Sequence, residues 1–159
     1  MNRHREIRLE SSLSEMFRVE QFVEEISDEH MLYGSYFGNI MMAVTEAVEN
    51  AIVHGNREDR AKAVRIKEEL TREGLWITVT DEGIGFNYRE YLQKAKDAGF
   101  NSEKTGLLVI QKLCDELRFS RDGRSLMMLF RINGIDEKIF SRRETFMQEF
   151  FRVYQKLNI

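Results

Sequence analysis

Residues 45–56 read TEAVENAIVHGN, and the polar side chains of Glu46, Asn50 and His54 recur in this stretch at intervals of four. Residues four apart lie one turn above another on the same face of a helix. The residues around them are mostly apolar, and a buried carboxylate is costly unless it meets a cation or a hydrogen-bond donor. The stretch therefore predicts an amphipathic helix with a polar stripe.

Two interpretations of this stripe are open. A solvated polar face is common on amphipathic helices and requires no ligand. The functional interpretation places a carboxylate base one turn from an oxygen ligand, because Mg²⁺ takes carboxylate or amide oxygens. A glutamate in that position can orient or deprotonate a hydroxyl group.

A second segment, VTDEGIGF at residues 79–86, favours the functional interpretation. Asp81 follows a predicted strand, where its carboxylate can accept hydrogen bonds from a nucleobase amino group. Gly83 and Gly85 allow the backbone to approach a flat ligand and to adopt positive φ. Taken alone, the segment also fits an ordinary turn. The chain contains neither a Walker loop nor a Rossmann fingerprint.

A third segment, EKTGLLVI at residues 103–110, places Thr105 and Gly106 before an apolar helix. A glycine at the start of a helix leaves backbone N–H groups free, which makes a natural phosphate cradle. The alternative is that Thr105 simply caps the helix.

The rest of the chain predicts alternating strands and helices. A capping box of Ser12 and Glu15 is expected to open the first helix, and Gly55-Asn56 is expected to close the second. Helices gathered apart from hairpin-paired strands indicate an α/β sandwich with a mostly antiparallel sheet. The predicted strands are 5–10, 63–70, 75–80 and two around Asp122-Gly123, and the predicted helices are 13–26, 35–54, 106–117 and 136–159.

Composition narrows the function classes. The 159 residues fit one domain with a sizeable core, and the net charge of −3 argues against a general affinity for nucleic acid or anionic membranes. Cys114 is the only cysteine, so no internal disulfide can form, which suits a reducing cytoplasm. No apolar run approaches the roughly 18 residues of a membrane span, and the N-terminus lacks a signal-peptide core.

In this order and spacing, ExxxNAxxHGN, DEGIGF and TGLLVI resemble the N, G1 and G2 boxes of the GHKL ATPase superfamily, which has the Bergerat fold. Within it, the chain resembles the anti-sigma-factor serine-protein kinases of bacteria. The resemblance extends from about Ser11 to Ile132. It implies an α+β, two-layer α/β sandwich over residues 1–134, with an extra C-terminal helix at 135–159 packed on the same domain.

The resemblance also assigns roles to individual residues. Glu46 matches the general base, and Asn50 matches the asparagine that coordinates Mg²⁺ and holds the ATP phosphates. His54 matches a histidine near the nucleotide, Asp81 matches the adenine-binding aspartate, and Gly83 and Gly85 match the glycines beneath the base. Thr105, Gly106 and Leu107 match the phosphate side of the lid. Ser125 matches a hydroxyl residue that holds adenine through water.

The G2 box departs from the family, because only Gly106 remains where the family carries more glycine. Lys104 can reach a phosphate as a point charge, and a glycine-poor lid affects turnover more than binding. The charged segment from Asn87 to Thr105 is expected to be mobile without nucleotide. The alternative is a folded helix in YREYLQKAKDAG, with Tyr88, Leu92 and Ala95 packing at helical spacing.

The family picture implies a cytoplasmic switch protein that binds ATP and Mg²⁺. It binds a sigma factor in one state, and it phosphorylates a serine on an anti-anti-sigma (STAS-type) partner. A homodimer is compatible with this picture, and no direct contact with nucleic acid or membrane is expected. Two alternatives stay open: a non-catalytic module that sequesters a partner, and the ATP-binding domain of a two-component kinase. The apolar face of the last helix is expected to pack on its own domain; it comprises Ile139, Phe146, Phe150, Val153 and Leu157.

Overall fold

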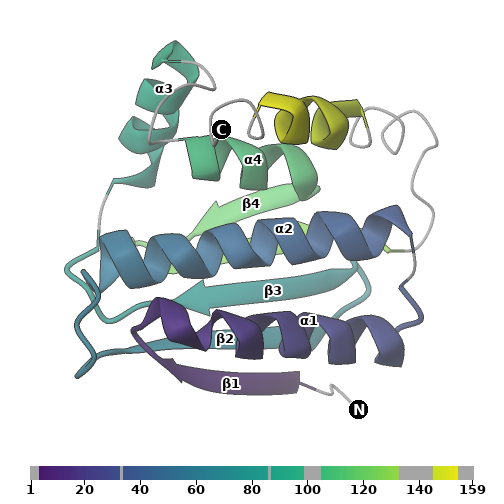
Figure 1. Cartoon of the computed structure of the whole chain (residues 1–159), viewed down its shortest axis with the longest axis horizontal. Coiled ribbons are helices and arrows are strands. Elements are labelled where there is room, and N and C mark those ends of the chain that lie inside the picture. The colour runs from purple at the N-terminus through teal and green to yellow at the C-terminus, as the bar shows by residue number, and fades with distance from the viewer. Residues whose placement is uncertain (1–3, 33, 86, 99–104, 133–144, 154–159) are drawn as a thin grey trace.

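The structure, a computed structural model, describes residues 4–32, 34–85, 87–98, 105–132 and 145–153. Its helices cover one face of a five-stranded sheet (Figure 1). The elements, in chain order, are β1 His4–Glu10, a 3-10 turn Leu13–Glu15, α1 Met16–Glu29, α2 Ser35–Asn50, a π-helical turn Ala51–Gly55, β2 Ala63–Leu70, β3 Leu75–Thr80, α3 Tyr88–Ala98, α4 Thr105–Leu113, β4 Glu116–Phe119, β5 Ser125–Phe130 and a helical segment at 145–153.

The strand order is β1-β2-β3-β5-β4, and every described neighbour pair is antiparallel. The predicted hairpin between β2 and β3 is confirmed, with the Thr71 N–H donating to the Gly74 carbonyl at 2.9 Å. Alternate residues of β3 lie against the helices, as the period-two pattern predicts. These features confirm the predicted α+β sandwich.

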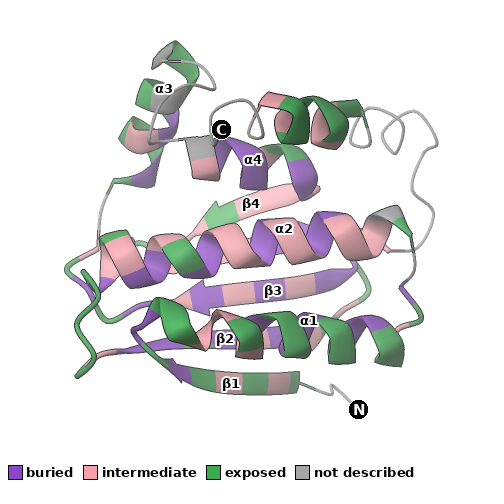
Figure 2. Cartoon of the chain, in the orientation of Figure 1, coloured by how far each residue is buried: buried purple, intermediate pink, exposed green. Residues whose placement is uncertain are grey.

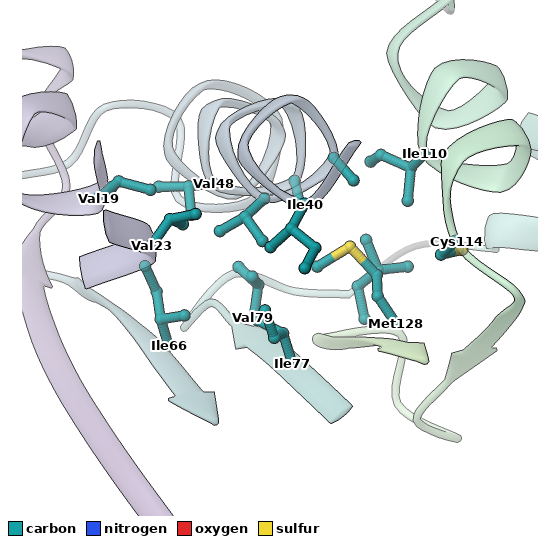
Figure 3. Packing of buried hydrophobic residues seen from close by; sticks show 14 of the residues in the cluster. Val19, Val23, Ile40, Val48, Ile66, Ile77, Val79, Ile110, Cys114 and Met128 are labelled. Carbon is teal, nitrogen blue, oxygen red and sulfur yellow. The ribbon is translucent and has the colours of Figure 1, made fainter. Parts of the chain in front are cut away.

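The core lies between this sheet and the layer formed by α1, α2 and α4. Figure 3 shows Ile77 and Met128 of the sheet below Ile40 of α2, with Ile110 of α4 beside them. All four side chains are fully buried. Helix α1 covers the β1–β2 end of the sheet and exposes its outer face, as Figure 2 shows. Because α2 packs between α1 and α4, its position sets where its polar residues emerge.

The start of α1 differs from the prediction. Ser12 caps the 3-10 turn, and its Oγ accepts a hydrogen bond from the Ser14 N–H at 3.3 Å. The Glu15 N–H donates to the Ser12 carbonyl instead, and the Glu15 carboxylate pairs with Arg18 at 2.7 Å. The predicted capping box is therefore wrong, because the intervening 3-10 turn changes which groups face each other.

The second predicted helix is confirmed, but its last turn is π-helical. The Asn56 N–H donates to the carbonyl of Ala51, five residues earlier, at 2.8 Å. The predicted end at Gly55-Asn56 is also confirmed, with Asn56 in the capping position. The positive φ that often follows a helix falls instead on Arg57 and Glu58, at 54° and 57°. Single π-helical turns are frequent at functional sites.

Two helices follow the first glycine motif, DEGIGF. Helix α3 buries Tyr88 and Leu92, which agrees with the folded alternative for this segment. Helix α4 ends at Leu113, four residues before the predicted end, because the Asp115 N–H already pairs with the Leu129 carbonyl of β5 at 2.7 Å. No helix in the described part of the chain is long and apolar enough to cross a membrane.

The C-terminal helix is present at 145–153. Phe146 and Phe150 of the predicted apolar face pack against the core, so this part of the face contacts its own chain; Met147, which was not predicted, packs there too. Ile139 and Leu157, with the remaining residues of the predicted helix at 136–144 and 154–159, lie outside the described residues. The assignment of 135–159 to the same domain remains a prediction.

Candidate nucleotide-binding site

The three sequence motifs meet at one end of the sandwich, where α2 ends, β3 ends and α4 begins (Figure 1). Two close approaches establish this convergence. A Cβ added at Gly106 would lie 2.9 Å from Glu46 Oε2 and 3.2 Å from Asn50 Nδ2. A Cβ added at Gly55 would lie 2.5 Å from the Asp81 carboxylate. The sequence motifs are therefore neighbours in space.

Glu46 and Asn50 lie side by side on α2 beneath the first turn of α4. Glu46 is half-buried, and this burial, followed by the charge of Glu49, raises the pKa of its carboxyl group. A carboxyl group with a raised pKa is better matched to proton transfer near neutral pH. Any side chain at Gly106 would displace the Glu46 carboxylate or the Asn50 amide, which explains why glycine occupies this position.

Asp81 lies at the end of β3 and is almost completely buried, at 3% exposure. Its Oδ1 accepts a hydrogen bond from the Gly83 N–H at 2.8 Å, and its own N–H donates to the Arg124 carbonyl at 3.0 Å. Burial raises the pKa of Asp81, while the Gly83 hydrogen bond and Arg124 act in the opposite direction. A buried carboxylate with few charged partners is typical of a binding site in which a ligand donates a hydrogen bond to it.

The glycines of this loop are required by close backbone packing. A Cβ at Gly83 would lie 2.1 Å from the Gly55 carbonyl oxygen, and one at Gly85 would lie 1.8 Å from the Asp122 carbonyl oxygen. Gly85 also has a φ of +76°, which favours glycine. The loop is therefore held between the π-helical turn on one side and the β4–β5 turn on the other.

Ser125 begins β5 directly opposite Thr80, the residue before Asp81. The two hydroxyl groups are hydrogen-bonded at 2.8 Å. Thr80 was not predicted as a site residue, although its position beside Asp81 at the end of the strand was visible in the sequence. The predicted water-mediated contact of Ser125 with adenine stays a prediction.

Asn56 is a second residue that the sequence motifs did not assign to the site. It is buried at 1% exposure, and its side chain joins the Ala63 carbonyl to the N–H of Glu82. The position of Asn56 at the end of HGN was visible in the sequence, but its partners lie 7 and 26 residues away.

The other predicted site residues are His54, Lys104, Thr105 and Leu107. His54 lies on the π-helical turn with an exposed side chain. The Leu107 side chain belongs to the hydrophobic core, so its role in phosphate binding rests on its backbone N–H. Thr105 opens α4, and Lys104 lies outside the described residues.

The donor set fits ATP with Mg²⁺. The described residues contain no group of three or more His, Cys, Asp or Glu side chains placed to hold a metal. Mg²⁺ commonly needs only one or two protein oxygens, because substrate phosphates and water complete its octahedron. The Asn50 amide lies beside the first turn of α4 and could supply one such oxygen; its role as a Mg²⁺ ligand stays a prediction.

An antiparallel α/β sandwich, with a buried aspartate at a strand end and a polar helical stripe beneath the start of the next helix, is the arrangement of a Bergerat-type nucleotide-binding domain. Residues 9–130 match the family described as histidine kinase-like ATPase domain. The chain belongs to this family, and the predicted family is confirmed.

Curated relatives place the chain in the predicted branch. It is 30% identical to an anti-sigma F factor of Clostridium perfringens over 125 residues, which cover 73% of this chain and 79% of the relative. It is 29% identical to the serine-protein kinase RsbW of Bacillus subtilis over 107 residues, covering 60% of this chain and 65% of the relative.

A solved structure supports the fold. The crystal structure of the RsbU and RsbW domains of Rv1364c from Mycobacterium tuberculosis matches with a TM-score of 0.59 and 21% identity. The match covers 81% of this chain and 32% of that one. At this identity, the likeness concerns the fold alone, and it confirms the predicted Bergerat fold.

Replacing Asp81 by Asn should weaken ATP binding by about 10- to 100-fold, because a hydrogen bond to a charged acceptor is worth roughly 1.5–3 kcal/mol. The same change should stabilise the nucleotide-free protein at neutral pH. Burial raises the Asp81 pKa, so its stabilising contribution is present below the ordinary carboxyl pKa and is lost as pH rises through the raised value.

Calorimetry with Mg²⁺-ATP and thermal unfolding at about pH 7 and pH 4 test these effects, since ordinary Asp titrates near pH 3.9. The stability advantage of the Asn variant should shrink at the lower pH. Unchanged ATP affinity in the folded variant would remove Asp81 from the site.

Helix α3 and the residues that follow it should exchange amide hydrogens more slowly when Mg²⁺-ATP is bound. Helix α3 has few buried side chains, and phosphate contacts near Gly106 would stabilise the segment between the two glycine motifs. Hydrogen exchange with and without Mg²⁺-ATP measures this. Slow exchange across residues 87–105 that ATP does not alter would identify the segment as a fixed insert.

Proposed function

We propose that this chain is an ATP-binding regulator of the anti-sigma-factor type, with serine-protein kinase activity toward an anti-anti-sigma partner. The contact of Gly106 with Glu46 and Asn50 carries the proposal, because it places a base, an oxygen ligand and free helical N–H groups together. Asp81, held against Gly55 at the other end of this site, gives the nucleobase its acceptor.

Each of these groups has a distinct task. The Asp81 carboxylate accepts a hydrogen bond from the adenine amino group, and the hydroxyl pair of Thr80 and Ser125 borders that position. The Asn50 amide oxygen would hold Mg²⁺, which supplies neutralisation of charge on the phosphates. The Glu46 carboxylate orients the attacking serine hydroxyl and accepts its proton. The N–H groups at the start of α4 receive phosphate oxygens.

The partner assignments follow from the named relatives. An anti-sigma F factor and a serine-protein kinase are among the proteins that this chain resembles. We therefore propose a sigma factor and a STAS-type anti-anti-sigma protein as its partners, acting in the cytoplasm. A homodimer is compatible with this assignment.

A partner-sequestering module without catalysis is the second candidate. One observation favours it: Gly106 is the only glycine at the start of α4, where the family usually has more. Fewer glycines restrict the backbone conformations with which this segment can close over phosphate. Such a module would hold ATP, or no nucleotide, would bind its partner and would transfer no phosphate.

Incubation of the purified chain with γ-labelled ATP and the sigma-regulating proteins encoded beside it distinguishes the two candidates. The kinase should transfer label to a serine of one partner with Mg²⁺ present, and chelation of Mg²⁺ should abolish transfer. Nucleotide and sigma-factor binding without label on any partner would favour the sequestering module. Absence of nucleotide binding would contradict the kinase.

A further inference from the structure

Asn56 connects the end of the α2 segment to the loop that carries Asp81. Its Nδ2 donates to the Ala63 carbonyl at 2.9 Å, and its Oδ1 accepts from the Glu82 N–H at 2.8 Å. The side chain is buried at 1% exposure, so both hydrogen bonds are shielded from water. Both polar atoms of this amide are therefore used, and each bond joins a different segment of the chain.

Glu82 closes the same connection from the opposite side. Its carboxylate accepts a hydrogen bond from the Ala63 N–H, while its own N–H is held by Asn56. Ala63 is the first residue of β2. Its carbonyl accepts a hydrogen bond from Asn56, and its N–H donates one to Glu82. We call the Asn56 and Glu82 side chains together with the Ala63 backbone the loop clamp.

The loop clamp completes the anchoring of three successive N–H groups. The Asp81 N–H is held by the Arg124 carbonyl, the Glu82 N–H by Asn56, and the Gly83 N–H by Asp81 itself. Of these, the Asn56 bond alone joins the loop to the helical segment that carries Glu46 and Asn50. Gly55, directly before Asn56, packs against the Asp81 carboxylate.

The geometry points to Asn56 as a positioning residue: through the Glu82 N–H, it holds the Asp81 carboxylate where it selects adenine over a base that lacks the 6-amino group. Asn56 does not touch the nucleotide; it acts on the residue that does. This inference rests on the proposed ATP site. Packing alone would explain Asn56 as a helix cap. The inference gives it a second role, in base selectivity.

Binding of ATP and ITP to the Asn56→Ala variant tests the inference. ITP carries an oxo group in place of the 6-amino group, so it cannot donate that hydrogen bond to Asp81. The variant should lose about tenfold in ATP affinity and less than about twofold in ITP affinity, so that the preference for ATP falls. A purely structural role would lower the unfolding temperature and leave the ratio of the two affinities unchanged, which would overturn the inference.

Asn87→Ala is the matched control. Asn87 also accepts a hydrogen bond from a backbone N–H, that of Glu90 at 3.3 Å, but this bond lies at the start of α3. The control should keep the wild-type affinity ratio. A wild-type protein that binds ATP and ITP equally would overturn the inference, because Asp81 would then not select adenine. A wild-type protein that binds neither nucleotide would contradict the proposed function.

Glu82→Ala keeps the test decisive if Asn56→Ala does not fold, because Glu82 is exposed and its truncation removes only one bond of the loop clamp. The ATP preference should fall about threefold in this variant. An unfolded Asn56→Ala together with a wild-type ratio in Glu82→Ala would overturn the inference and leave Asn56 a purely structural residue.

Discussion

Replacing Glu46 by Gln should slow phosphate transfer to the partner by about 10²- to 10⁴-fold while ATP affinity stays within about tenfold. Gln keeps the shape of the side chain beside Gly106 and Asn50, so the nucleotide site retains its packing. It cannot accept a proton from the serine hydroxyl. Single-turnover transfer of labelled phosphate, with ATP affinity from calorimetry, separates the chemical step from binding.

Glu49→Gln is the matched control for this prediction. Glu49 is exposed on the same helix, and its charge contributes to the raised pKa of Glu46. The control should transfer phosphate, but the acidic limb of its pH–rate profile should move to lower pH, because removing the neighbouring charge lowers the Glu46 pKa. Transfer at the wild-type rate by Glu46→Gln would show that the assigned base is wrong.

The sequence is most informative about elements whose burial pattern is regular. The β3 residues Leu75, Ile77 and Val79 alternate with half-exposed positions, and the structure buries all three. The spacing of Glu46 and Asn50 likewise survives folding, because the α-helix continues regularly through Asn50. Local periodicity carries this information, so no distant contact is needed to predict it.

The buried polar contacts could not be predicted in the same way. Glu68 occupies a strand position that resembles its charged neighbours, yet it is 4% exposed and pairs with His30 Nε2 at 2.6 Å. The two residues are 38 positions apart, and the pairing depends on where α1 ends above β2. Nothing local to either residue distinguishes this pair from solvated surface charges.

The π-helical turn is a similar case. Its five residues, Ala51–Gly55, fit a continuing α-helix equally well by periodicity. The π-helical turn brings Gly55 against Asp81 and places Asn56 beside Glu82. These long-range contacts decide whether the turn is α-helical or π-helical. The sequence therefore predicts the motif residues but not how they pack together.

Replacing Gly83 by Ala should abolish measurable ATP binding, with a loss of more than about 100-fold, and should destabilise the protein by roughly 1–3 kcal/mol, as overpacking of a close contact typically does. The added Cβ would lie 2.1 Å from the Gly55 carbonyl oxygen and 2.9 Å from Asp81 Oδ1. The first of these atoms belongs to the backbone, so relief requires the loop to move away from the π-helical turn. That movement displaces Asp81.

Gly38→Ala is the control that distinguishes this steric effect from a general cost of losing glycine. Gly38 lies inside α2, where an added Cβ would meet only Met147 Cε, at an ordinary contact distance of 3.8 Å. Alanine in a helix interior is favoured over glycine by about 1 kcal/mol, so this variant should be at least as stable as the wild type and should bind ATP normally. Thermal unfolding and calorimetry on both variants provide the comparison. ATP binding by Gly83→Ala at wild-type strength would mean that nucleotide recognition does not require the loop to stay in contact with the π-helical turn.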